Sequence, residues 1–134
     1  MNQTSMAFLG YITYMMVLLL ILVSIRFHAT LTGKKRVNDF KSDGTDVSEF
    51  SGRLCRVHVN SYEHFPIFGG LMLFALALDF THISNQLALY LLAARVLQGV
   101  VHLFSTNANA VRVRFAFFLA QYVIAAIWIF NFLK

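Results

Sequence analysis

Long uncharged apolar segments constrain the fold of this chain more than any other feature. The segment Ser5–Ile25 contains no charged residue, and neither do the later segments Phe65–Leu78, Ile83–Ala94 and Phe115–Leu133. The first and last reach the roughly 20 residues that a helix needs to cross a hydrocarbon core of about 30 Å. The two middle segments reach that length only by including neighbouring polar residues. We therefore expect an integral membrane protein.

The composition supports this expectation, since 58% of the 134 residues are hydrophobic and only 13% are charged. The first apolar segment lacks a basic start and a cleavage site, so we interpret it as a retained span and not as a signal peptide. Nothing before Gly33 breaks its helix, which we expect to extend towards Arg36. The predicted fold is all-α, a four-helix membrane bundle forming one domain over residues 1–134, with spans at about 5–35, 47–78, 83–104 and 111–133.

Positive charge is distributed unevenly between the connections. The basic residues between spans one and two are Arg26, Lys34, Lys35, Arg36, Lys41, Arg53 and Arg56, and those before span four are Arg112 and Arg114. By the positive-inside rule, these two connections face the cytoplasm, and both termini lie on the other side. This topology and attraction to anionic headgroups explain the net charge of +5, so we predict contact with membrane lipid and none with nucleic acid.

A stripe of polar residues marks the start of span two. It consists of Arg53, Arg56, Asn60 and Glu63, separated by three, four and three residues. At 3.6 residues per turn these side chains share one helix face, and ionisable groups at membrane depth usually face a partner or a wet cavity. Two guanidinium groups, an amide and a carboxylate suit a small zwitterion that carries carboxylates and an ammonium.

A weaker stripe, Arg95, Gln98 and His102, lies in the same half of span three, and Arg112 and Arg114 begin span four. All these groups fall near the cytoplasmic ends of their helices. The simplest arrangement gathers them in one pocket with an apolar floor. Oligomerisation would give such a pocket more room, because a groove between subunits can hold a polar ligand beside an apolar one.

Other kinds of site have little support in the sequence. The single cysteine, Cys55, excludes an intramolecular disulfide and a thiolate metal cluster. It sits between two arginines, which allows either a reactive thiol or a packing role. The five histidines are scattered without a close pair, so we predict no metal site.

The sixteen residues from Arg53 to Phe68, RLCRVHVNSYEHFPIF, closely resemble the signature of the membrane-associated proteins in eicosanoid and glutathione metabolism (MAPEG). The pattern is Arg-x-x-Arg-x-His/Gln-x-Asn-x-x-Glu-x-x-Pro. The resemblance implies a homotrimer that binds glutathione between adjacent subunits near the cytoplasmic face. It further implies a microsomal glutathione transferase of bacterial type, situated in the inner membrane.

Within span two, the resemblance implies that Arg56, Asn60 and Glu63 bind glutathione. Arg56 would then pair with a carboxylate and Glu63 would accept from the ammonium. His58 stands where relatives have His or Gln. His64 stands where some relatives have a tyrosine that contacts the tripeptide.

Within spans three and four, Gln98 and His102 occupy positions where many relatives have His or Tyr, followed by Tyr. The second tyrosine is absent here, so activation of the thiol by a phenol is not expected. Arg114, in the pattern Arg114-x-x-x-Phe118, resembles the catalytic cation that stabilises the glutathione thiolate, with Arg112 as the alternative.

Two further basic positions are left open. The resemblance implies that a basic residue at the end of span one reaches the neighbouring subunit's pocket, and either Arg26 or the pair Lys34 and Lys35 fits. Arg95 matches a recurrent arginine of the family. It could equally well form a structural ion pair.

The leading hypothesis is a transferase that conjugates glutathione to lipophilic electrophiles, with peroxidase activity towards lipid hydroperoxides as an additional reaction. The alternative is a non-catalytic protein of the same fold that binds lipid or serves as a scaffold, which the missing tyrosine favours. An ion or solute pathway has little support, since no helix carries charge along its full depth.

Overall fold

The computed structural model describes residues 1–134 and contains four α-helices and no strand, as predicted. Helix α1 spans Gln3–Leu31, α2 Glu49–Ala77, α3 Thr81–Phe104 and α4 Ala108–Phe132. Helices α1, α3 and α4 are long and apolar enough to cross a membrane. Helix α2 is as long as α1, at 29 residues or about 43 Å, but its first half carries the charged stripe.

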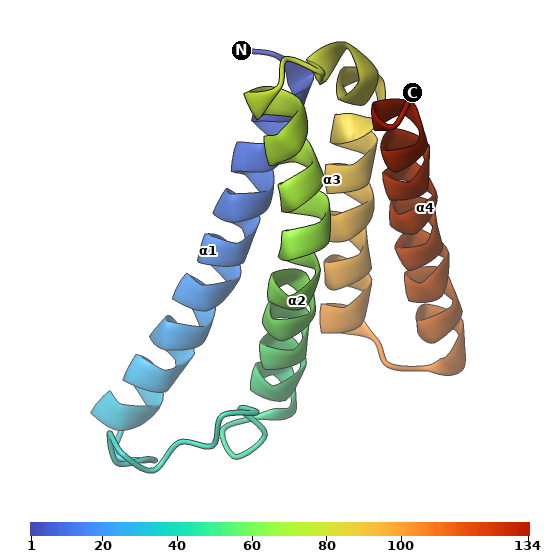
Figure 1. Ribbon diagram of the computed structural model, residues 1–134. Coiled ribbons are helices and arrows are strands. Elements are labelled where there is room, and N and C mark those ends of the chain that lie inside the picture. Colours follow the sequence, from blue (N-terminus) through green and yellow to red (C-terminus); the bar gives the residue numbers. More distant parts are fainter.

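Helices α2 and α3 occupy the middle of the bundle, with α1 on one side and α4 on the other (Figure 1). Helix α1 packs on α2 and α3 and does not contact α4. Both termini lie at one end of the bundle. The connection of residues 32–48 and the short link of residues 105–107 lie at the opposite end, which we call the loop end (Figure 1).

The helix boundaries follow from their capping residues. The hydroxyl of Ser48 accepts a hydrogen bond from the Ser51 N–H and begins α2. The prediction that the first helix extends to about residue 35 is wrong, because α1 ends at Leu31. Gly33 adopts a left-handed conformation with φ of 71°, and the Lys34 N–H bonds to the Ala29 carbonyl at 3.0 Å. This Schellman motif ends the helix before Lys34, Lys35 and Arg36.

The interior contains two apolar clusters. The larger lies in the half of the bundle nearer the termini and comprises Ala7, Tyr11, Phe68, Met72, Ala88, Leu91, Ala125 and Trp128. The smaller joins α1 to α2 nearer the loop end and comprises Leu18, Leu22, Leu54, Cys55 and Val57. Because Cys55 is buried in this cluster, its packing role is supported.

Close packing of α1 and α2 on α3 depends on Gly99. A Cβ atom there would collide with the Tyr14 hydroxyl and approach a Val57 methyl at 3.0 Å. We expect Gly99→Ala to lower the free energy of unfolding by about 1–3 kcal/mol, because the neighbours must move apart. The melting temperature of the detergent-purified protein measures the effect.

Gly70 in α2 provides the matched control, because a Cβ atom there would meet nothing within 4 Å. Since alanine favours the helix over glycine by about 0.5–1 kcal/mol, Gly70→Ala should leave the melting temperature unchanged or raise it slightly. Equal destabilisation by the two substitutions would show that helix packing at Gly99 is not the cause.

Candidate functional site

A cavity of about 690 Å³ lies at the loop end, between α2, α3 and the start of α4. This volume falls in the range of small-molecule sites. Its polar lining consists of Ser42, Asp43, Arg56, Asn60, Ser61, Glu63, Arg95, Gln98, His102 and Arg114. Val57, Val59, Val111, Phe115 and Phe118 supply apolar wall, so the cavity combines a charged region with a hydrophobic one.

Six of the nine predicted site residues line this cavity, and they come from three helices. They are Arg56, Asn60 and Glu63 of α2, Gln98 and His102 of α3, and Arg114 of α4. Arg56 and Glu63 are exposed and form no ion pair within the chain. Both therefore remain available to a charged ligand.

The other three predicted residues, Arg26, His58 and His64, do not line the cavity. His64 bonds through Nδ1 to the Asn60 carbonyl at 2.7 Å and stacks on Phe68, so it packs inside the bundle. Arg26 donates to the Lys41 carbonyl at 3.1 Å, and its guanidinium lies over Phe40. Within a single chain, these three residues therefore lie outside the cavity that the other six line.

Arg95 is the most buried charged group of the cavity wall, with 1% of its surface exposed. One guanidinium nitrogen donates to the Asn60 Oδ1 at 2.6 Å, and the group lies within 6 Å of the ring centres of Tyr11 and Phe68. It forms no salt bridge, and its Nε and second terminal nitrogen have no hydrogen-bond partner. A buried cation that lines a cavity and has no acidic partner in the chain is suited to stabilise an anion bound there.

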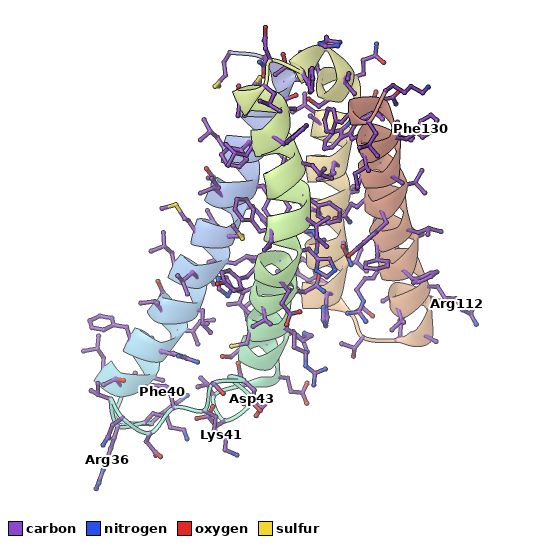
Figure 2. All side chains as sticks on the ribbon, in the orientation of Figure 1. Arg36, Phe40, Lys41, Asp43, Arg112 and Phe130 are labelled. Carbon is purple, nitrogen blue, oxygen red and sulfur yellow. The ribbon has the colours of Figure 1, made fainter.

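The two arginines at the start of α4 differ in position. Arg114 lines the cavity, is half-buried, and has an Nε without a partner. Arg112 is exposed, donates a hydrogen bond to the Asn109 side chain at 3.4 Å, and points away from the bundle (Figure 2). Of the two candidates for the catalytic cation, only Arg114 faces the cavity of its own chain.

Arg53, the first residue of the stripe, ties α2 to α3. Its Nε donates to the Leu103 carbonyl at 2.8 Å, and a terminal nitrogen lies 3.9 Å from Glu49. Because it is absent from the cavity lining, its geometry agrees with a supporting role.

Gln121 of α4 is a polar residue next to the site that the sequence analysis did not identify. It is fully buried, and its side-chain nitrogen donates to Gln98 Oε1 at 2.9 Å and to the Phe117 carbonyl at 2.8 Å. The available signal was that Gln121 is the one amide in the otherwise apolar stretch of residues 115–130, since polar groups at membrane depth usually face a partner.

The connection before α2 also contributes to the cavity, through Ser42 and Asp43. Figure 2 shows Asp43 next to the start of α2. Lys35 holds the connection in place with an ion pair of 3.0 Å to Asp46, whose carboxylate also accepts from the Lys41 N–H at 3.1 Å. The sequence pattern gave no sign that Ser42 and Asp43 form part of the cavity wall.

The stability of the ordered conformation of this connection should depend on pH. The Lys35 ammonium and the Lys41 N–H hold the pKa of Asp46 below its ordinary value. Its stabilising contribution is therefore complete above the unfolded pKa of about 3.9 and disappears as the pH falls through the lower folded pKa. At pH 7 we expect Asp46→Asn to increase hydrogen exchange across residues 32–48.

Asp39 is the matched control, because it lies 4.0 Å from the same ammonium but is 68% exposed. Asp39→Asn should leave hydrogen exchange of the connection unchanged. Unchanged exchange in Asp46→Asn would contradict the role of the Lys35 pair.

Comparison with known proteins provides a family assignment. The sequence model described as "MAPEG family" matches residues 4–133, almost the whole chain. No curated protein and no solved structure matches the chain.

Proposed function

Because this chain belongs to the MAPEG family, we propose that it is a membrane-bound glutathione transferase that joins glutathione to lipophilic electrophiles. The observation that carries the proposal is the cavity that holds Arg56, Arg95, Arg114 and Glu63 together. Three cations and a carboxylate complement a tripeptide with two carboxylates, an ammonium and an ionisable thiol.

The polar wall supplies a partner for each charged group of glutathione. Arg56 and Arg95 would bind the two carboxylates, since both are cations of the cavity wall without an acidic partner in the chain. Glu63 would accept from the ammonium. Asn60 already accepts from Arg95 through Oδ1, so its amide nitrogen would donate to a peptide carbonyl. The cavity volume of about 690 Å³ leaves room for a second, apolar substrate.

Arg114 would stabilise the thiolate. A guanidinium in a site of low dielectric favours the ionised sulfur, and the thiol proton passes to water. The sulfur then forms a bond to an electrophilic carbon of the second substrate, whose leaving group departs with the bonding electrons. Phe115 and Phe118, next to Arg114 on the cavity wall, suit a substrate that enters from the bilayer. The same thiolate could also reduce a lipid hydroperoxide.

The proposed assembly is a homotrimer with the loop end in the cytoplasm of a bacterial cell. Two of the predicted residues outside the cavity, Arg26 and His58, would then contribute to the site of a neighbouring subunit. The basic residues of the loop end support this orientation by the positive-inside rule.

The test is the ultraviolet difference spectrum of the detergent-purified protein on addition of glutathione. We expect saturable binding and the absorbance of a thiolate at pH 7. Binding without a thiolate would favour the second candidate, a non-catalytic relative, which Gln98 and His102 support because they replace a possible phenol. No binding would contradict the proposed function and favour lipid binding.

A further inference from the structure

The hydrogen bond between Gln121 and Gln98 fixes the orientation of both amides. The Gln121 side-chain nitrogen lies 2.8 Å from the Phe117 carbonyl, which only accepts, so the atom at this position must be the donor NH₂. The same NH₂ lies 2.9 Å from the Gln98 side chain, which must therefore present its oxygen. One backbone carbonyl thus determines which way two amides point.

The orientation of Gln98 has a consequence for the cavity. Its oxygen is directed to Gln121, so its NH₂ group points away from that residue. No protein atom accepts from this nitrogen, and it is not among the buried atoms that lack a partner. Gln98 lines the cavity, whereas Gln121 does not. The free N–H donors of Gln98 are therefore accessible from the cavity.

We propose that Gln121 is a positioning residue that holds the Gln98 amide with its N–H donors towards the cavity, where they bind an oxygen of glutathione. An oxygen is the expected partner because amide N–H groups bond more strongly to carboxylate and carbonyl oxygens than to sulfur. The inference rests on the proposed function, since it assumes that glutathione occupies this cavity. It assigns a role in glutathione binding to a buried residue of α4 that does not touch the ligand.

A double-substitution cycle on glutathione affinity tests this role. We expect Gln98→Leu to weaken binding roughly tenfold, the effect of one hydrogen bond to a charged acceptor. Gln121→Leu should weaken it roughly three- to tenfold, because the Gln98 amide becomes free to rotate. In the Gln98→Leu background, Gln121→Leu should have no further effect. Gln121→Met offers a second variant of similar volume in case the branched side chain impairs folding.

A second measurement separates positioning from a purely structural role. The thiol pKa of bound glutathione should be the same in Gln121→Leu and in the unchanged protein, because the amide binds an oxygen. Asn131→Leu is the matched control: Asn131 of α4 donates to the Ile127 carbonyl at 2.8 Å, the same local bond, but lies away from the cavity. It should leave glutathione affinity unchanged.

Each other outcome is decisive. Unchanged affinity in Gln121→Leu, or an equal loss in the Gln98→Leu background, would overturn the positioning role. A shifted thiol pKa would overturn the assignment of an oxygen as the partner. If the unchanged protein does not bind glutathione, the proposed function fails and this inference fails with it.

Discussion

Replacement of Arg114 by alanine should lower the rate of conjugation by about 10²–10³-fold, the usual cost of removing one group that stabilises developing charge. Arg114 is the only basic residue of α4 on the cavity wall, so no neighbour on that helix replaces its charge. Without it, the thiol pKa of bound glutathione should rise towards the value of about 8.5 for a free thiol. The rate should then increase with pH up to that value.

The measurement is a pH profile of conjugation with a lipophilic electrophile, together with the thiolate absorbance at each pH. Arg112→Ala is the matched control, because Arg112 is exposed and points away from the bundle, and it should match the unchanged protein. Arg114→Lys keeps the charge and should recover part of the rate. If Arg112→Ala abolishes the reaction and Arg114→Ala does not, the catalytic cation is wrongly assigned. If neither matters, the thiolate mechanism is wrong.

The features that the sequence predicts well are those set by local periodicity. The uncharged apolar segments predict four helices, and spacings of three and four residues place each polar stripe on one helix face. The polar residues Arg56, Asn60, Glu63, Gln98 and His102 consequently reach one cavity.

The features that the sequence does not predict depend on contacts between distant segments. Spacing along α3 cannot show that Arg95 lies between Tyr11 and Phe68 without an acidic partner. Nor can spacing reveal that Gln121 reaches across to Gln98. Each of these contacts depends on how two helices are rotated against each other, which a single-helix pattern leaves undetermined.

The end of α1 illustrates a different limit. The sequence pattern predicted that the first helix extends to about residue 35. In the structure, Gly33 adopts a left-handed conformation and α1 ends at Leu31. A glycine next to polar residues indicates a possible helix end, and the exact boundary depends on backbone hydrogen bonds such as that from Lys34 to Ala29.

Replacement of Arg95 by methionine should weaken glutathione binding without lowering the stability of the ligand-free protein. Methionine has a similar length and no charge, so the cavity wall loses a cation that has no acidic partner in the chain. We expect glutathione affinity to fall at least about 30-fold, because loss of a buried charge partner costs about 2–5 kcal/mol of binding free energy. Raising the melting temperature with glutathione should consequently require a much higher ligand concentration.

The ligand-free protein should respond differently to Arg95→Met. The substitution removes one hydrogen bond to Asn60 and contacts with two aromatic rings, worth about 1–3 kcal/mol together, but it also removes a buried charge whose desolvation costs several kcal/mol. The melting temperature without glutathione should therefore stay equal or rise. Arg53→Met is the control, because Arg53 bonds to Leu103 outside the cavity and should not affect affinity. A large loss of stability in ligand-free Arg95→Met would show that Arg95 is a structural residue, because only a ligand site retains an unpaired buried cation at the expense of stability.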